Sequence, residues 1–97
     1  MWKIYTAPEF DKWFSNQTEK EKQGIRGRIS KIELQGHFGE HKTVSDNNII
    51  WELKWKNGRR VYYAYLQDLE ILLLLGGNKN GQTKDIREAK KIYKKYE

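Results

Sequence analysis

The sequence contains no cysteine, a single proline and only two histidines. The absence of cysteine excludes a disulfide framework and thiolate metal sites, and it fits a protein of the reducing cytoplasm. With His37 and His41 as the only imidazoles, a structural zinc site is nearly excluded as well. No apolar run approaches the roughly 18 residues of a membrane span, and the first residues lack the apolar segment of a secretory signal.

The length of 97 residues suits one domain and is too short for two, so we expect residues 1–97 to form a single domain. Hydrophobic residues make up 37% and charged residues 33% of the chain, which is polar for a globular protein. Aromatic residues nevertheless reach 13%, and their large side chains can supply a core. The composition therefore favours a folded domain over a disordered chain.

Basic residues exceed acidic ones by 19 to 13, which gives a net charge of +6. Nearly all of the excess lies in residues 49–97, with eleven Lys and Arg against six Asp and Glu. This imbalance favours a polyanionic partner, most often nucleic acid, or an acidic protein. The alternative is a surface charge that only keeps a small protein in solution.

The first third of the chain predicts a short strand followed by two helices. Residues 2–5 are apolar and β-prone, as is typical of a strand. Capping-box patterns begin at Thr6 and at Thr18, each with a glutamate three residues later, and Gly36 marks a helix end. Residues 6–36 are therefore expected to form a helical hairpin.

In the second half the hydrophobic period changes to two, the period of β-strands. Asn57 and Gly58 indicate a hairpin, and the unbroken apolar run 71–75 predicts a strand buried on both faces inside the sheet. We expect an edge strand near 42–45, strands at 51–55, 59–66 and 68–75, a loop at 76–81, and a last helix from residue 80 or 81.

Two helices followed by a run of strands and a last helix predict an α+β domain. The expected sheet is twisted and mostly antiparallel, with the N-terminal helical hairpin on one face and a C-terminal helix. We expect the helices to share one face and the other face to be open to solvent or a ligand.

The hairpin register decides which side chains share a face. A two-residue turn at 57–58 would place the guanidinium of Arg60 among tryptophans without a partner. A three-residue loop at 56–58, with Gly58 in the left-handed conformation, pairs Lys54 with Arg60 instead. We expect this second register, which gathers Glu52, Lys54, Arg60 and Tyr62 on one face. Like charges on neighbouring strands are unfavourable alone, so the pair suggests a phosphate site; the alternative is that both side chains extend into water.

Four blocks stand out in order: residues 36–42 (GHFGEHK), 51–54 (WELK), 58–63 (GRRVYY) and 72–86 (LLLLGGNKNGQTKDI). Together they resemble the RelE/ParE toxin superfamily, and most closely its HigB-like "addiction module killer protein" branch, over about residues 10–92. The family pattern has aspartate where this chain has Glu40 and Asn78, and arginine where it has Lys54.

The resemblance implies a type II toxin, a metal-independent endoribonuclease that cuts ribosome-bound mRNA in the cytoplasm. It implies no cofactor, and a cognate antitoxin encoded alongside, which we expect to be a helix-turn-helix protein. By position, the recurrent basic site residues are Lys42, Lys54, Arg60 and Lys79. For contacts with nucleic acid we expect Tyr62, Gln82, Lys84, Asp85 and Lys91, of which Gln82 and Asp85 match the family's loop–helix signature.

Cleavage of RNA at a 2′-hydroxyl has demands that these residue types can meet. The 2′ proton must be removed, a dianionic phosphorane stabilised, and the leaving 5′-oxygen protonated. Arg60 suits a bidentate grip on phosphate oxygens. Lys54 or Lys42 would serve as the base, and Lys79 as the acid or as a charge stabiliser.

Two other functions stay open from the sequence alone. One is a ParE-like gyrase-inhibiting toxin, which binds its target without nuclease chemistry. The other is a non-catalytic nucleic-acid-binding module, whose affinity would fall steeply with salt. A clustered set of four cations favours the nuclease.

Overall fold

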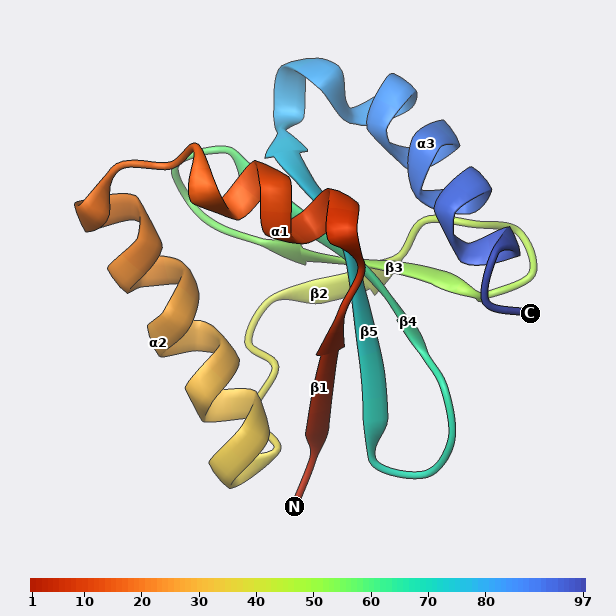
Figure 1. The fold of residues 1–97 in the computed structure, drawn as a ribbon, viewed down its shortest axis with the longest axis horizontal. Helices are drawn as coiled ribbons and strands as arrows, with labels where there is room; N and C mark the ends of the chain where they lie inside the picture. Colours follow the sequence, from red (N-terminus) through yellow and green to blue (C-terminus); the bar gives the residue numbers. More distant parts are fainter.

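Five β-strands and three α-helices make up the computed structural model, which describes residues 1–97 (Figure 1). The strands are β1 (Lys3–Thr6), β2 (His41–Thr43), β3 (Ile50–Lys54), β4 (Arg59–Tyr65) and β5 (Glu70–Asn78). The helices are α1 (Pro8–Ser15), α2 (Glu19–Gln35) and α3 (Gln82–Lys94), and a short 3-10 turn, η1 (Lys79–Gly81), precedes α3. The α+β class predicted from the sequence is confirmed. No helix combines the length and apolar content needed to cross a membrane.

The sheet has the strand order β1-β5-β4-β3-β2, with β1 parallel to β5 and all other neighbours antiparallel. β5 therefore lies between two strands, and its residues 71–74 are buried. A strand inside a sheet that is covered on both faces has no exposed side, which explains its unbroken apolar run. The prediction of an interior strand is confirmed.

The hairpin of α1 and α2 packs on one face of the sheet (Figure 1). Phe10 of α1 and Ile25 and Ile32 of α2 are buried in this core. The sheet contributes Leu53, Val61, Tyr63, Ile71 and Leu73. α2 ends at Gly36, whose φ of +67° is the left-handed conformation expected of a C-terminal glycine. The predicted helical hairpin is confirmed.

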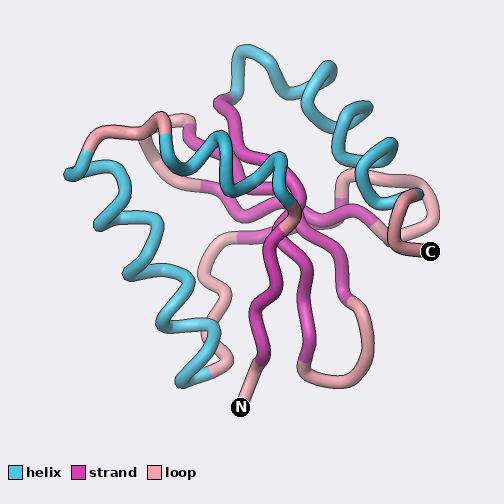
Figure 2. The backbone as a smooth tube through the Cα atoms, in the orientation of Figure 1, coloured by secondary structure: helices cyan, strands magenta, loops and turns pink.

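α3 packs against the opposite face, so the prediction that all helices share one face was wrong. Ala89 and Ile92 of α3 are buried in a second core with Tyr62, Leu72 and Leu74. Figure 2 shows α3 lying apart from the α1–α2 hairpin. The apolar positions of a helix fit any apolar surface, so its spacing alone does not specify which sheet face it covers.

The two predicted capping boxes have different outcomes. At α2 the Thr18 hydroxyl accepts from the Glu21 N–H at 3.1 Å, and the Glu21 carboxylate accepts from the Thr18 N–H at 2.9 Å. At α1 no side chain caps the helix, and the N-cap residue is Ala7. Thr6 still belongs to β1, and the Ala7 N–H donates to the Leu73 carbonyl at 2.9 Å. Pairing with the sheet thus moves the helix start one residue beyond the predicted cap.

The loop predicted at 76–81 is in fact the end of β5 followed by η1. Gly76 and Gly77 continue the ladder with β4. A Cβ atom on Gly76 would collide with the Trp13 ring, and one on Gly77 with the Asp85 carboxylate. The two glycines therefore serve the close approach of a helix side chain on each face of a regular strand, rather than a turn.

Candidate active site

The β3–β4 hairpin closes through the three-residue loop that the sequence predicts. Gly58 has φ of +95°, and the Trp55 N–H donates to the Arg59 carbonyl at 3.0 Å. Lys54 is the direct cross-strand partner of Arg60. Because side chains alternate along a strand, both lie on the face that α3 covers.

The register places Lys42 on this face as well, while Lys79 lies beyond the end of β5, next to the β3–β4 loop. Lys42 pairs with Glu52 across β2 and β3. The Lys79 N–H donates to the Gly58 carbonyl at 2.8 Å, and the Lys79 side chain lies over Gly58. Lys42 stands on the outer strand, two strands from Arg60, which is about 10 Å at the usual spacing. The structure therefore pairs Lys54 with Arg60, places Lys79 beside the loop that joins their strands, and leaves Lys42 on the edge strand.

Arg60 is largely enclosed, whereas the predicted phosphate grip needs an accessible guanidinium. Its side chain is 10% exposed, and its Nε lies 3.3 Å from Oε1 of the fully buried Glu52. Gln82, the first residue of α3, donates through Nε2 to the other Glu52 oxygen at 2.7 Å. A terminal guanidinium nitrogen of Arg60 donates to the Arg59 carbonyl at 3.0 Å. The sheet and α3 thus enclose an ion pair.

Two of the predicted nucleic-acid contacts lie in the same enclosed region. Tyr62 is fully buried, so in this arrangement it cannot touch a nucleic acid. The Asp85 carboxylate packs over Gly77. Burial raises the pKa of the Tyr62 phenol and of the Asp85 carboxyl above their ordinary values, and the nearby Glu52 charge adds to the Tyr62 shift.

Three buried polar atoms in this region have no hydrogen-bond partner within the protein: Oε1 of Glu52, Nε of Arg60 and the Tyr62 hydroxyl. The first two still form the ion pair, 3.3 Å apart, without the geometry of a hydrogen bond. Unpartnered buried polar atoms are rare in protein interiors. Their concentration beneath the first turn of α3 distinguishes this region from an ordinary core, and we call it the polar cluster, together with Gln82 and Asp85.

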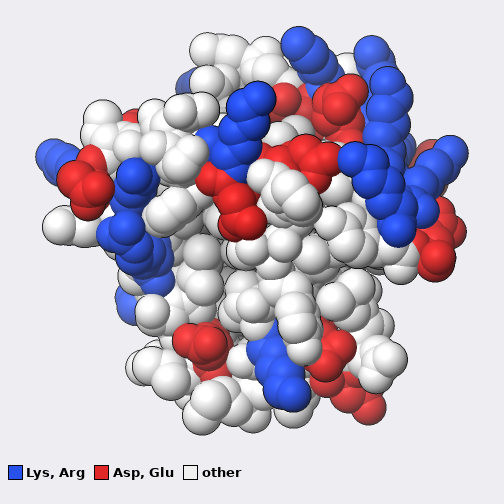
Figure 3. Space-filling model, viewed as in Figure 1, with Lys and Arg blue, Asp and Glu red and all other residues white.

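Half-buried and exposed lysines lie on β3, in η1 and along α3, the elements that carry or adjoin the polar cluster. Lys54 is 26% exposed and lies 3.5 Å from the Glu40 carboxylate. Lys79 and Lys84 are exposed and form no ion pair, while Lys91 pairs at 3.6 Å with a glutamate one turn earlier in α3. Figure 3 shows basic side chains gathered over α3. No group of three or more His, Asp or Glu side chains is placed to hold a metal ion.

A family model described as "Phage derived protein Gp49-like (DUF891)" matches residues 12–97. The chain belongs to this Gp49-like family. An uncharacterized protein of Haemophilus influenzae is 38% identical over 90 residues, in an alignment that covers 90% of this chain and 88% of that protein.

Solved structures show that the Gp49-like chain has a fold similar to RelE-like toxins. A chain in the RelB–RelE antitoxin–toxin complex of Methanococcus jannaschii matches with a TM-score of 0.67 at 10% identity, covering 84% of this chain and 96% of that one. A chain in the YoeB–YefM complex of Staphylococcus aureus matches with 0.58 at 16% identity, covering 78% and 94%. A conserved hypothetical protein of Helicobacter pylori matches with 0.57 at 17% identity, covering 82% and 97%. The predicted RelE-like fold is confirmed, and the HigB-like branch stays a prediction.

Sequence analysis does not single out Arg28, which supports this site in the Gp49-like protein from α2. Its guanidinium donates to the backbone carbonyls of Phe38, Glu40 and Lys54. The same group lies 4.4 Å from the centre of the Trp55 ring, a cation–π contact. Burial lowers the pKa of Arg28 from its ordinary value. Nothing in the sequence separates this arginine from the other polar residues of α2.

Glu52 is the second residue that sequence analysis does not assign to the site, although a signal for it is present. The predicted register already places Glu52 on the face of Arg60 and Tyr62, opposite Tyr62 itself. Glu52 on β3 is the diagonal neighbour of Arg60 on β4, and a carboxylate in that position is close enough to be the counter-ion of a buried guanidinium. The enclosure of the pair by α3 could not be foreseen, because α3 was expected on the other face.

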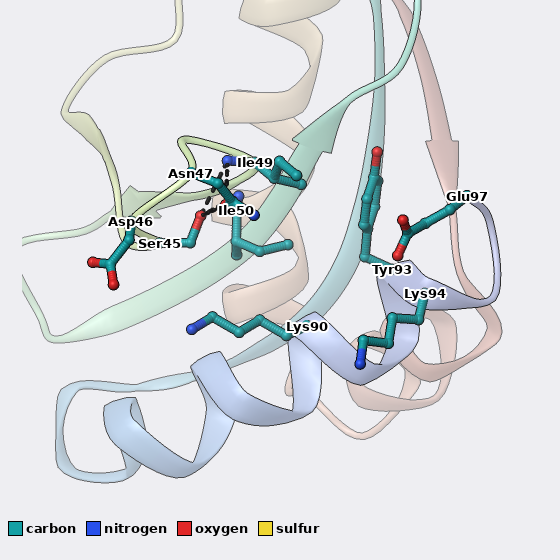
Figure 4. A pocket seen from close by; sticks show the side chains of 9 residues that line it. All are labelled: Ser45, Asp46, Asn47, Ile49, Ile50, Lys90, Tyr93, Lys94 and Glu97. Carbon is teal, nitrogen blue, oxygen red and sulfur yellow. Dashed lines mark hydrogen bonds between the residues drawn. The ribbon is translucent and has the colours of Figure 1, made fainter.

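Two hollows open beside these elements. The first has a volume of about 340 Å³ and lies between the β2–β3 loop and α3 (Figure 4). Lys90, Tyr93 and Lys94 of α3 line it, while the Ser45 hydroxyl holds the loop by accepting two backbone N–H groups at 3.0 Å. This hollow lies toward the C-terminal end of α3, away from Gln82. The second, of about 330 Å³, lies between the helical hairpin and the β3–β4 loop.

Proposed function

We propose that this protein is the toxin of a type II toxin–antitoxin module, and that it is an endoribonuclease acting on ribosome-bound mRNA in the cytoplasm. The sequence blocks favour the HigB-like branch. The observation that carries the proposal is the direct cross-strand pairing of Lys54 with Arg60, with the Lys79 side chain over Gly58 in the loop that joins the two strands. The RelE-like fold supports the same function.

The proposed reaction uses the accessible lysines at the scissile phosphate. The ribose 2′-oxygen gives its proton to the base and attacks phosphorus, the P–O5′ bond breaks, and the 5′-oxygen takes a proton from the acid. The products then carry a 2′,3′-cyclic phosphate and a 5′-hydroxyl. Lys54 or Lys42 is the proposed base, and Lys79 the proposed acid or charge stabiliser. The cations offset the charge that develops on the phosphorane.

Arg60 supports this chemistry from behind the lysines. Its guanidinium is held by Glu52 and by backbone carbonyls, so its charge has a fixed position. A bidentate grip on phosphate would require the guanidinium to exchange Glu52 for the phosphate. We therefore assign direct phosphate contact to Lys79, and also to Lys54 where Lys42 is the base, and we assign electrostatic support to Arg60.

An antitoxin is the proposed protein partner, and we expect it to be a helix-turn-helix protein. Two structural relatives occur in complexes named RelB–RelE and YoeB–YefM. The net charge of +6 and the basic side chains over α3 suit an acidic or amphipathic segment of such a partner. Co-purified antitoxin is expected to abolish RNA cleavage, and undiminished cleavage in the complex would contradict this view.

Charge-removing variants of the exposed lysines test the proposed site with little risk to the fold. Lys54→Gln and Lys79→Gln are compared with Lys31→Gln, which changes an exposed lysine of α2 that forms no ion pair. The wild type and K31Q are expected to arrest growth and to cut mRNA in a translating extract. K54Q and K79Q should lose activity by about tenfold or more, since each removes either a group that transfers a proton or a charge at the phosphate.

The outcomes separate the three functions considered. Full cleavage by both K54Q and K79Q would reject the assigned site. A DNA-damage response without loss of mRNA would identify a ParE-like gyrase inhibitor. Salt-dependent RNA binding without cleavage, even with translating ribosomes, would identify a non-catalytic binding module.

A further inference from the structure

A polar cavity lies next to the proposed active site, on the other side of the β3–β4 loop. Its volume is about 330 Å³, at the small end of the range for ligand sites. Hydrogen-bonding side chains and one indole line it: Trp13, Gln17, Glu21, Asn57, Arg59 and Asn78. A cavity of this size with an aromatic wall suits a single planar heterocycle.

The hydrogen-bond donors of the cavity are held in position but have no acceptor within the protein. Oδ1 of Asn57 accepts from the Arg59 N–H at 2.9 Å, and Oδ1 of Asn78 accepts from the Asn80 N–H at 2.9 Å. Both amide nitrogens therefore stay free. The Arg59 guanidinium lies 5.4 Å from the centre of the Trp55 ring and makes no hydrogen bond or ion pair within the protein.

Acceptors are held in the same way. Gln17 donates through Nε2 to the Trp13 carbonyl at 3.0 Å, which leaves its Oε1 free. Oε1 of Glu21 accepts from the Thr18 N–H at 2.9 Å, which leaves Oε2 free. The cavity thus offers unpaired donors and acceptors together, with one positive and one negative side chain.

The cavity carries one positive and one negative charge, so it suits a different ligand from the sheet face that holds Lys54 and Arg60. A phosphate would be attracted by Arg59 but repelled by Glu21, whereas a neutral base can satisfy both. Guanine presents two acceptors, O6 and N7, which suit a guanidinium, and two donors, N1–H and the N2 amino group, which suit a carboxylate. Adenine lacks this pair of donors. We propose that this cavity binds a guanine base.

This inference rests on the proposed function, because the guanine would belong to the RNA that is cut. The cavity would then make the enzyme select cleavage sites next to a guanine. Arg59 and Arg60 are consecutive in β4, so their side chains point to opposite faces of the sheet. Asn78 in the cavity directly precedes Lys79 on the cationic face. An RNA strand that crosses the loop at 56–58 would place a guanine in the cavity and a neighbouring phosphate at the cations.

Binding is tested by nuclear magnetic resonance titration of the isotope-labelled protein with GMP, AMP, CMP, UMP and inorganic phosphate. Asn57→Asp and Asn78→Asp keep the oxygen that accepts the backbone N–H but remove the free amide donor. Asn47→Asp is the matched control, because Oδ1 of Asn47 likewise accepts from Ser45 in the other hollow (Figure 4). Unchanged backbone spectra would show that the variants are folded.

We expect GMP to bind at least tenfold more tightly than the other four probes and to shift the Trp13 indole and Gln17 amide signals. N57D and N78D should each weaken GMP binding by about tenfold, as for the loss of one base contact, and N47D should not. Equal binding of all nucleotides and phosphate, absence of GMP binding, or GMP affinity that N57D and N78D leave unchanged would each overturn the guanine site.

Mapping of cleavage sites separates this inference from the proposed function. Among the sites that each variant cuts, N78D is expected to lose the preference for positions next to guanine that the wild type and N47D show. GMP binding in a protein that never cleaves RNA would leave the guanine site standing and reject the nuclease. RNA cleavage by a protein that does not bind GMP would reject the guanine site and leave the nuclease standing.

Discussion

The enclosed Glu52–Arg60 pair predicts a strong energetic coupling. Glu52 is fully buried and the Arg60 side chain is 10% exposed, so removal of either partner leaves the other charge buried without a counter-ion. We expect Arg60→Met or Glu52→Met alone to lower the free energy of unfolding by about 3–5 kcal/mol. Small domains are stable by only about 5–15 kcal/mol. The double variant removes both charges at similar volume and should recover most of the loss.

Urea unfolding followed by tryptophan fluorescence measures this cycle. The coupling free energy is the sum of the two single losses minus the loss in the double variant, so it is expected to be about 5 kcal/mol or more, above the usual range for contacting residues. The Lys91–Glu88 pair of α3, at 3.6 Å and with side chains 67% and 47% exposed, is the matched control; its coupling should stay below about 1 kcal/mol. Additive effects of the two methionine substitutions would refute the argument that these charges depend on each other.

Three further variants test the packing, the electrostatics and the capping of the fold. In the urea assay, Gly76→Ala should destabilise the protein by about 1–3 kcal/mol, because the added methyl group collides with the Trp13 ring. Gly27→Ala is the control, because the space around Gly27 is open, and it should stabilise the protein by about 0.5–1 kcal/mol through α2. Burial raises the pKa of Asp85 above its unfolded value of 3.8, so the charged carboxylate destabilises the folded state at neutral pH. Asp85→Asn should therefore have a higher urea midpoint than the wild type at pH 7. The difference should shrink toward pH 4, because the wild-type carboxyl becomes protonated there. Thr18→Ala should lower stability by about 1 kcal/mol, measured as a shift in thermal midpoint, and no shift would mean that the cap contributes nothing.

Local patterns determined the parts of the fold that the sequence predicts well. The Asn57–Gly58 loop, the alternation along β3 and the cost of burying Arg60 among tryptophans together require one hairpin register, which the structure has. The capping box at Thr18 is equally local, since both of its hydrogen bonds lie within four residues. Such signals need no knowledge of where distant segments pack.

The parts that sequence reasoning missed depend on distant segments. The face chosen by α3 decides whether Arg60 is open or enclosed, yet the apolar spacing of α3 is compatible with either face. Arg28 reaches the end of β3 across 26 positions of sequence, and Gln82 reaches Glu52 across 30. The lysines and arginines of the site could therefore be placed on one face from the sequence, but their exposure and counter-ions could not.

Stability does not explain why the Glu52–Arg60 pair is present beneath α3. Well-packed apolar side chains at such positions are usually as stable as a buried ion pair, or more so, and the second core supplies apolar neighbours in Tyr62, Leu72 and Leu74. The buried Tyr62 hydroxyl, which has no hydrogen-bond partner within the protein, lowers stability further. A non-catalytic binding module would need only surface cations, which this chain already carries around α3. A guanidinium held in a fixed position next to Lys54 suits the stabilisation of a transient phosphorane, which is the role that the proposed endoribonuclease gives to this pair.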